Sequence, residues 1–133
     1  MNDAIEFYDS AIKGVARKAA DILIQLQALV HRSEGRPRID AGSAWSMPVL
    51  IEAINATPEH VPPAPTRIYD GVVETAKGTM QGLAPLPSDI LGPVRLRLET
   101  NDGSLQLRAE RLEIRAQGPG KYLEEFPGGS SDG

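Results

Sequence analysis

The sequence contains no cysteine among its 133 residues. Without thiols the chain cannot form disulfides, thiolate zinc sites, iron–sulfur clusters or a cysteine nucleophile. Small secreted domains commonly depend on disulfides, so this absence favours a reducing compartment. Asp3, Glu6 and Asp9 lie where a secretory signal would be basic, and no apolar segment follows them. We therefore expect a cytoplasmic protein.

Aromatic residues, basic excess and long apolar runs are also scarce. Aromatics make up 5% of the chain and the net charge is -4, whereas nucleic-acid binders usually carry a basic excess. The one basic cluster, Arg32, Arg36 and Arg38, is interrupted by acidic residues. The longest apolar runs, 22–24 and 49–51, are too short to span a bilayer. We expect neither nucleic acid nor a membrane as partner.

The residues that usually carry catalysis are few. The two histidines, His31 and His60, have no second ligand at i+4, and we expect both to serve as caps or to face solvent. Gly78 and Gly82 are not followed by the Lys-Ser/Thr of a phosphate-binding loop. Residues 42–47 lack the closing glycine of a nucleophile elbow. We predict no catalytic residues, no metal and no cofactor.

The first third of the chain has helical periodicity. Apolar residues recur at alternating steps of three and four from Ile5 to Leu29, a heptad pattern that predicts a long helix over about residues 3–32. Such a helix would be about 45 Å long and would overhang a domain of this size. Gly14 could instead break it. The narrow first half of the stripe predicts a helix–helix interface with a second copy or a partner, formed by Ile5, Tyr8, Ile12 and Val15.

The middle of the chain is less regular. Residues 46–54 predict a short second helix, with Trp45 in the loop before it as a candidate interface anchor. Residues 61–65 predict a stiff proline-rich connector. Residues 67–82 fit either a helix or a strand; β-branched residues favour a strand over 67–75. Residues 82–93, rich in proline and glycine, predict a loop.

A β-hairpin over residues 94–116 is the clearest element. Apolar and polar residues alternate on both sides of Asp102-Gly103, which predicts a two-residue turn there, with Leu98 opposite Leu107. The alternation slips by one at residues 110–111, which predicts a bulge or a bend. The outward face of this hairpin carries a third candidate binding surface, formed by Arg95, Arg97 and Arg108.

These patterns predict one α+β domain over residues 1–125, with the helices packed on a small, mainly antiparallel sheet, and a disordered Gly/Ser tail over 126–133. The thin catalytic inventory and the acidic balance favour a non-enzymatic protein-binding module, such as an adaptor or a toxin-neutralising, immunity-like protein. The alternative is a small-ligand binder or an enzyme with a scattered polar site between helix and sheet. Charged groups converging on a concave pocket would favour that alternative.

Overall fold

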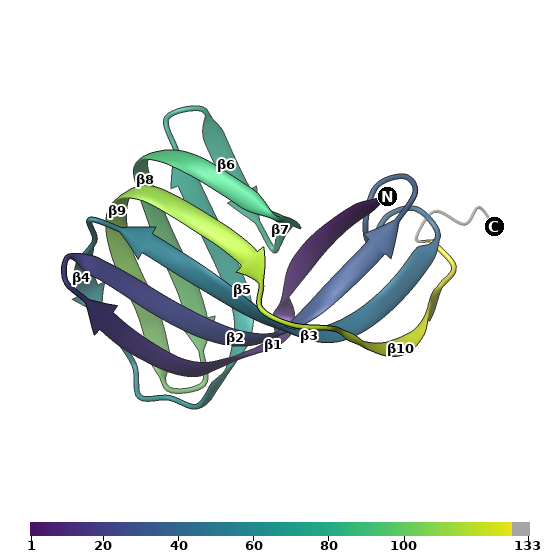
Figure 1. Ribbon diagram of the computed structural model, residues 1–133, viewed down its shortest axis with the longest axis horizontal. Helices are drawn as coiled ribbons and strands as arrows, with labels where there is room; N and C mark the ends of the chain where they lie inside the picture. Colours follow the sequence, from purple (N-terminus) through teal and green to yellow (C-terminus); the bar gives the residue numbers. More distant parts are fainter. Residues whose placement is uncertain (129–133) are drawn as a thin grey trace.

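The computed structural model describes residues 1–128, and this part of the chain is all-β, without a helix (Figure 1). The predicted α+β class is therefore wrong. The strands are β1 (Asn2–Lys18), β2 (Asp21–Ser33), β3 (Gly42–Ile54), β4 (Thr57–His60), β5 (Thr66–Thr75), β6 (Gly78–Gln81), β7 (Leu83–Leu86), β8 (Ser88–Thr100), β9 (Gly103–Ala116) and β10 (Lys121–Phe126).

Six of these strands close into an antiparallel barrel. The order around the ring is β1, β2, β3, β9, β8 and β5, and β5 returns to β1 through the pairs of Ala11 with Arg67 and Ile12 with Thr66. β4 and β6 add to the edges of β9 and β5, and β7 pairs with the start of β1. The interior is filled by aliphatic side chains and Phe7.

The segment predicted as one long helix is the β1–β2 hairpin, which turns at Ala19 and Ala20. Along β2 the inner positions from Ile22 to Val30 alternate strictly and are buried. Along β1 register shifts between Glu6 and Ala11 and between Ile12 and Gly14 interrupt the alternation. The bulges change which residues face inward, so two strands with a period of two together read as steps of three and four. Because no helix forms here, the predictions that it overhangs the domain or breaks at Gly14 are also wrong.

The predicted short helix is also wrong, because residues 42–54 form β3. Pro48 is compatible with the first turn of a helix, but in the structure it lies where the strand paired with β3 changes from β10 to β9. β10 pairs with β3 up to Ser46, and β9 pairs with it from Val49. A proline is tolerated at this gap because no ladder hydrogen bond requires its missing N–H. The predicted loop over 82–93 is likewise wrong, since it contains β7 and the start of β8.

Two strand predictions are confirmed. The segment predicted over 67–75 is β5, and β6 follows it after a tight turn. The hairpin over 94–116 is formed by β8 and β9, but its loop is Asn101-Asp102, one residue earlier than predicted, so Leu98 faces Leu105. Gly103 then follows the turn with a φ of 112°. The corrected register moves each partner by two residues, which keeps the apolar face intact.

The predicted phase slip at residues 110–111 is confirmed, because Ala109 and Leu112 are both buried while Glu110 is exposed. The pairing irregularity lies opposite, between Leu91 and Val94 of β8. At the end of the chain, Phe126 is the last residue of β10. Most of the predicted tail, residues 129–133, lies outside the described residues, and the domain boundary at 125 stays a prediction.

β1, β2 and β3 are longer than the barrel and continue beyond it. Their ends and β10 form a curled sheet beside the barrel, which carries the N-terminus (Figure 1). We call this sheet, made of residues 2–6, 29–33, 42–46 and 121–126, the extension. It is the part of the molecule in which polar and aromatic side chains gather.

Candidate functional site

The strand register assigns the side chains of the extension to two faces. Val30 lies opposite Ile5 and Trp45, and this face continues the barrel interior. His31 lies opposite Ala4 and Ala44, and this second face continues the barrel exterior. We call them the inner and the outer face. Because the side chains of a strand alternate, neighbouring residues of β2 serve different surfaces.

His31 is the unusual residue of the outer face. Further along β2 the outer positions at Gln25 and Gln27 are exposed, but His31 is only 6% exposed. Its Nε2 lies 2.7 Å from Oε1 of Glu6, and the ring of Phe126 meets the imidazole edge-on at a centroid distance of 5.3 Å. Its Nδ1 is buried and has no hydrogen-bond partner among the described residues.

Glu6 contacts both His31 and the guanidinium of Arg38. Arg38, in the connection between β2 and β3, donates from Nε to Oε2 of Glu6 at 2.9 Å. Asp40 shapes this loop by accepting hydrogen bonds from the backbone and the guanidinium of Arg36, which lower the pKa of Asp40. The Glu6 side chain is 12% exposed and has both oxygens engaged, one by His31 and the other by Arg38.

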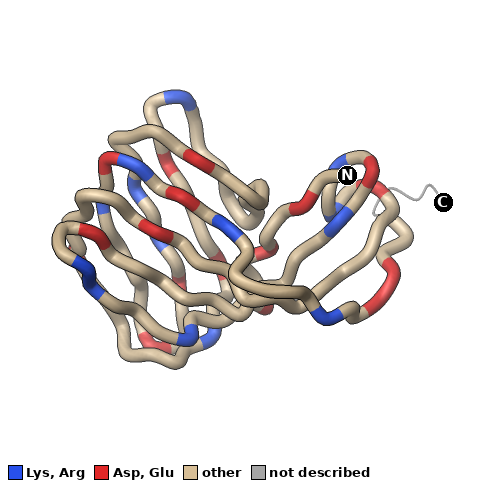
Figure 2. Tube along the Cα trace, in the orientation of Figure 1, with Lys and Arg blue, Asp and Glu red and all other residues tan. Residues whose placement is uncertain are grey.

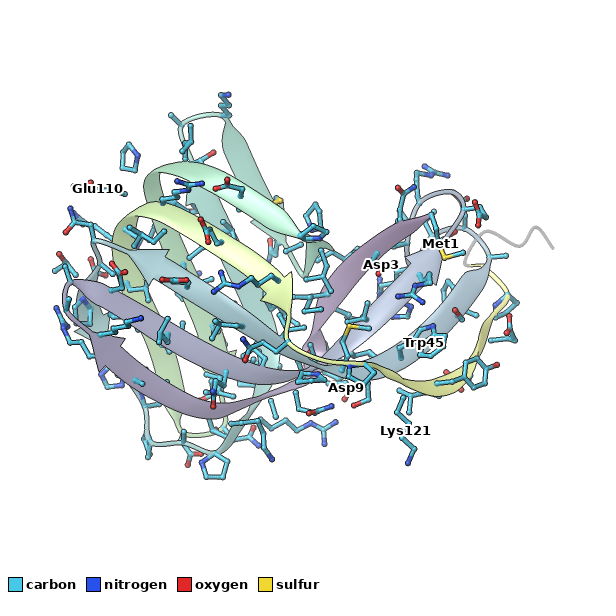
Figure 3. The ribbon with its side chains drawn as sticks, viewed as in Figure 1. Met1, Asp3, Asp9, Trp45, Glu110 and Lys121 are labelled. Atoms are coloured by element: carbon cyan, nitrogen blue, oxygen red, sulfur yellow. The ribbon has the colours of Figure 1, made fainter. Side chains whose placement is uncertain are left out.

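These groups line a cavity of about 670 Å³ on the outer face. Its lining combines charged groups from distant parts of the sequence with apolar walls: Glu6, Asp9, Leu29, His31, Arg38, Ala44, Leu123, Glu124 and Phe126. Asp9 belongs to the bulge of β1 and forms an ion pair with Arg67 of β5; Figure 3 shows it where the extension meets the barrel. The lining contains no hydroxyl, thiol or amine; its charged and titratable groups are three carboxylates, one histidine and one guanidinium.

The inner face carries a second cluster, which we call the aromatic platform: Asp3, Arg32, Trp45 and Tyr122. Arg32 lies over the Trp45 ring at 5.1 Å, and Tyr122 of β10 meets Trp45 edge-on at 5.5 Å. Asp3 accepts two hydrogen bonds from Arg32, which raise the pKa of that guanidinium. Figure 3 shows Trp45 and Asp3 within the extension. Tyr122 is 48% exposed, so the platform is open to solvent.

The residues predicted as a helical seam do not form one surface. Ile5 and Ile12 are fully buried in the core, and Val15 packs against the core. Tyr8, in the bulge of β1, is 55% exposed. A seam of these residues required helical spacing, which the strands do not have. Trp45 lies on β3 and not in a loop, but it does belong to an exposed cluster.

The charge of the predicted arginine surface is largely offset by neighbouring glutamates. Arg95 and Arg108 lie directly opposite one another on β8 and β9, and Glu59 of β4 forms ion pairs with both. Arg97 pairs with Glu99 of its own strand. Figure 2 shows basic and acidic residues interspersed along the barrel strands. The two carboxylates offset most of the charge of the three arginines, and exposed ion pairs of this kind contribute little to binding.

The sequence reasoning missed the His31 cavity. The predicted helix over residues 3–32 separated Glu6 and His31 at its two ends, so the two were never considered together. Their contact depends on the β1–β2 register, which places Glu6 beside Leu29 and Ala4 beside His31. No local motif marks this pair. The strict alternation of apolar residues over 22–30 is the one signal that could have indicated a strand, and through it the cavity.

In residues 1–128 no three His, Asp or Glu side chains are arranged to hold a metal ion. Within the same residues no helix has the length and apolar character needed to cross a membrane. No family model matches the chain, and neither the curated proteins nor the solved structures searched contain a match. The function must therefore be argued from the two faces of the extension.

Proposed function

We propose that this protein is a non-enzymatic protein-binding module whose contact surface is the aromatic platform. The observation that carries the proposal is the cluster of Arg32, Trp45 and Tyr122 on one solvent-open face, with Arg32 over the Trp45 ring and Tyr122 edge-on to it. Arginine, tryptophan and tyrosine are the residue types that dominate binding energy at protein interfaces. Asp3 holds Arg32 in place through two hydrogen bonds, so little side-chain entropy remains to be lost on binding.

The edge of the platform favours a partner with basic groups. Glu125 of β10, opposite Ser43 on the same face, is exposed and accepts a hydrogen bond from the hydroxyl of Tyr122. With a net charge of -4 for the whole chain, a basic partner would be attracted over a longer range than a neutral one. An adaptor, or an immunity-like protein that neutralises a basic toxin, would use such a surface.

The experiment compares proteins captured from a lysate by wild-type chain and by two variants. Trp45→Ala and Tyr122→Ala should each lose the captured partner, because truncating a central interface anchor costs at least about 2 kcal/mol of binding free energy. Tyr69→Ala is the matched control, since Tyr69 is 51% exposed but lies on β5, away from the platform. Equal capture by wild type and both platform variants would contradict the proposal.

Self-association is tested with the same variants. If the partner is a second copy of the chain, light scattering should show a dimer for wild type and for Tyr69→Ala. Tyr122→Ala should then be a monomer with an unchanged circular dichroism spectrum. Tyr122 is the better variant here because it is more exposed than Trp45, which also packs against the core. A dimer that survives this substitution would place the self-interface elsewhere.

The His31 cavity supports a second candidate function. Charged groups do converge on a concave pocket there, which is the observation expected of a small-ligand binder. The cavity lies on the opposite face of the same strands, so both functions are compatible in one molecule.

A further inference from the structure

The last part of β1 has an unpaired edge. Residues 14–18 pair with β2 on one side, but β5 pairs with β1 only at Ala11 and Ile12. No strand among the described residues pairs with the other side of 14–18. The pairing with β2 is regular over this stretch, which contains no proline. The edge therefore presents backbone N–H and C=O groups with which a further strand can pair.

The cations of this edge have no acidic partner. Among residues 1–128, every arginine except Arg17 forms an ion pair with an Asp or Glu side chain. Lys18, and Lys13 just before the edge, form no ion pair in this part of the chain either, and all three side chains are exposed. Asp21, opposite Lys18 on β2, instead accepts a hydrogen bond from the backbone of Asn55. The edge therefore carries an excess of positive charge.

β10 provides an edge of the opposite charge. Of the described strands it pairs with β3 alone, with a shift at Leu123 and a regular register over 124–126. Glu124 and Glu125 are exposed, and within residues 1–128 neither forms an ion pair. Figure 1 shows β10 and the dark purple end of β1 at opposite ends of the molecule. The two edges can therefore meet only between two copies of the chain.

The two edges match in the faces of their side chains as well as in charge. Arg17 lies opposite the buried Ile22 and so on the inner face, which places Lys18 on the outer face. On β10, Glu125 belongs to the inner face and Glu124 to the outer face. Antiparallel pairing places Arg17 beside Glu125 and Lys18 beside Glu124 at the same time. Parallel pairing can align only one of these pairs, because the order of the carboxylates is then reversed.

We propose that residues 14–18 of β1 receive β10 of a second copy of the chain as an antiparallel strand. Opposite charges directly across two strands are favourable, whereas like edges bring cations or glutamates together and repel. The contact is head-to-tail, so each end of a dimer keeps one edge free and the assembly can extend. The pairing uses strand edges and does not depend on the stacking of Arg32 on Trp45.

The first test is sedimentation velocity of the full chain at concentrations up to the millimolar range. The contact is short compared with a standard interface, so we expect reversible association at high concentration only. Added salt should weaken it, because the charge pairs are exposed. A wild-type chain that stays monomeric throughout would overturn the proposal, and the charges would then serve only to keep strand edges apart.

Two charge reversals test the pairing itself. Lys18→Glu and Glu124→Lys should each weaken association about tenfold, because each places like charges across the contact. An equimolar mixture should associate again, since the intact β10 of the first variant meets the intact β1 edge of the second. A mixture that associates no better than the separate variants would contradict the proposal.

The matched controls are Lys77→Glu and Glu110→Lys. Both residues are exposed, form no ion pair within residues 1–128 and lie outside the two edges, on the β5–β6 turn and on β9. Each control should associate like wild type. Equal weakening by the controls would mean that net charge alone governs association, which would overturn the pairing.

Hydrogen exchange tests whether the contact is a strand pairing. In concentrated solution alternate amides of 14–18 and 124–126 should exchange more slowly than in dilute solution, while those of Gly78–Gln81 on the edge strand β6 should not change. Association without this protection would overturn the proposal. Trp45→Ala should associate normally. If it abolishes association and Lys18→Glu does not, the self-contact lies on the aromatic platform, which leaves the proposed function intact and removes this inference.

Discussion

The β1–β2 and β8–β9 hairpins differ in how they hold their register. In β8–β9 the pairing from Val94 to Thr100 is uninterrupted, and the turn itself sets it. In β1–β2 the register shifts twice, and residues from outside the hairpin stabilise the larger irregularity. Phe7, within that bulge, donates its backbone N–H to Gly82 between β6 and β7. One hairpin is therefore specified locally, and the other by the tertiary structure around it.

The bulge of β1 shows how that specification works. Phe7 is fully buried and its ring lies so close to Gly71 of β5 that a Cβ there would be 2.5 Å from it. Ser10 is also fully buried, and its hydroxyl donates to the carbonyl of Glu6 and accepts from the N–H of Leu29. The hydroxyl thus replaces a backbone hydrogen bond that is missing between β1 and β2 at the bulge. The bulge is therefore stabilised by specific contacts.

The largest expected effect is at Phe7. Phe7→Ala should lower the free energy of unfolding by about 3–5 kcal/mol, because it leaves a cavity at the junction of β1 and β5. Tyr8→Ala, a truncation one residue away at an exposed site, should change it by less than about 0.5 kcal/mol. Denaturant unfolding of both variants measures the difference. Similar losses for the two would mean that the bulge is not anchored through Phe7.

A smaller effect is expected at Ser10. Ser10→Ala leaves the buried N–H of Leu29 without its acceptor and should cost about 1–3 kcal/mol. Thr66, in the adjoining strand, has a buried hydroxyl without a partner among the described residues. Thr66→Val should therefore be neutral or stabilising, since it removes an unsatisfied group at constant shape. Thermal unfolding of Ser10→Ala and Thr66→Val compares a hydroxyl that forms hydrogen bonds with one that forms none. Destabilisation by Thr66→Val would contradict this assignment.

The β8–β9 hairpin should depend on a single backbone conformation. Gly103 has a φ of 112°, which a β-branched residue avoids, so Gly103→Val should cost about 1–3 kcal/mol. Asp102→Val is the matched control, because Asp102 is exposed and is not among the residues with positive φ. Equal melting temperatures for the two variants would show that the turn does not require glycine.

The smallest effect concerns the surface of the same hairpin. Arg111 of β9 donates two hydrogen bonds to Asp89 of β8, which lower the pKa of Asp89. A lowered pKa in the folded state adds stability above the unfolded-state pKa, and this is lost as the pH falls through the folded-state value. Arg111→Gln should return the pKa of Asp89 towards its ordinary value in an NMR titration. Asp40, whose pKa is lowered by Arg36, is the internal control and should not change.

The same contrast explains which predictions succeeded. The β8–β9 hairpin was recognised because its alternation, its turn residues and its register all lie within 23 consecutive residues, 94–116. Its loop was misplaced by one residue because Asp-Gly was assigned to the two central turn positions. The glycine instead follows a turn formed by Asn101-Asp102. β5 was recognised from the β-branched residues Val72 and Val73, which are both buried.

The candidate site was predicted only in part. Trp45 was selected as an interface anchor, but Tyr122 and Arg32, which complete its cluster, come from other strands. The cavity was not predicted at all, because Glu6, His31, Arg38 and Glu124 are separated in sequence and meet through strand pairing. A periodicity argument cannot bring such residues together when it has assigned the wrong period to β1 and β2.

The sequence by itself determined the absence of thiol chemistry, the acidic balance and the hairpin between residues 94 and 116, since these depend on composition or on neighbours along the chain. Only the tertiary structure decided that residues 2–33 are strands. Apart from the alternation over 22–30, their apolar spacing fits a helix as well as it fits a bulged hairpin, and in the first strand local sequence does not choose between the two. The choice is made by burial: closing the barrel pairs β1 with β5 and β7 and places Ile5, Phe7 and Ile12 in one core, which an isolated helix could not provide.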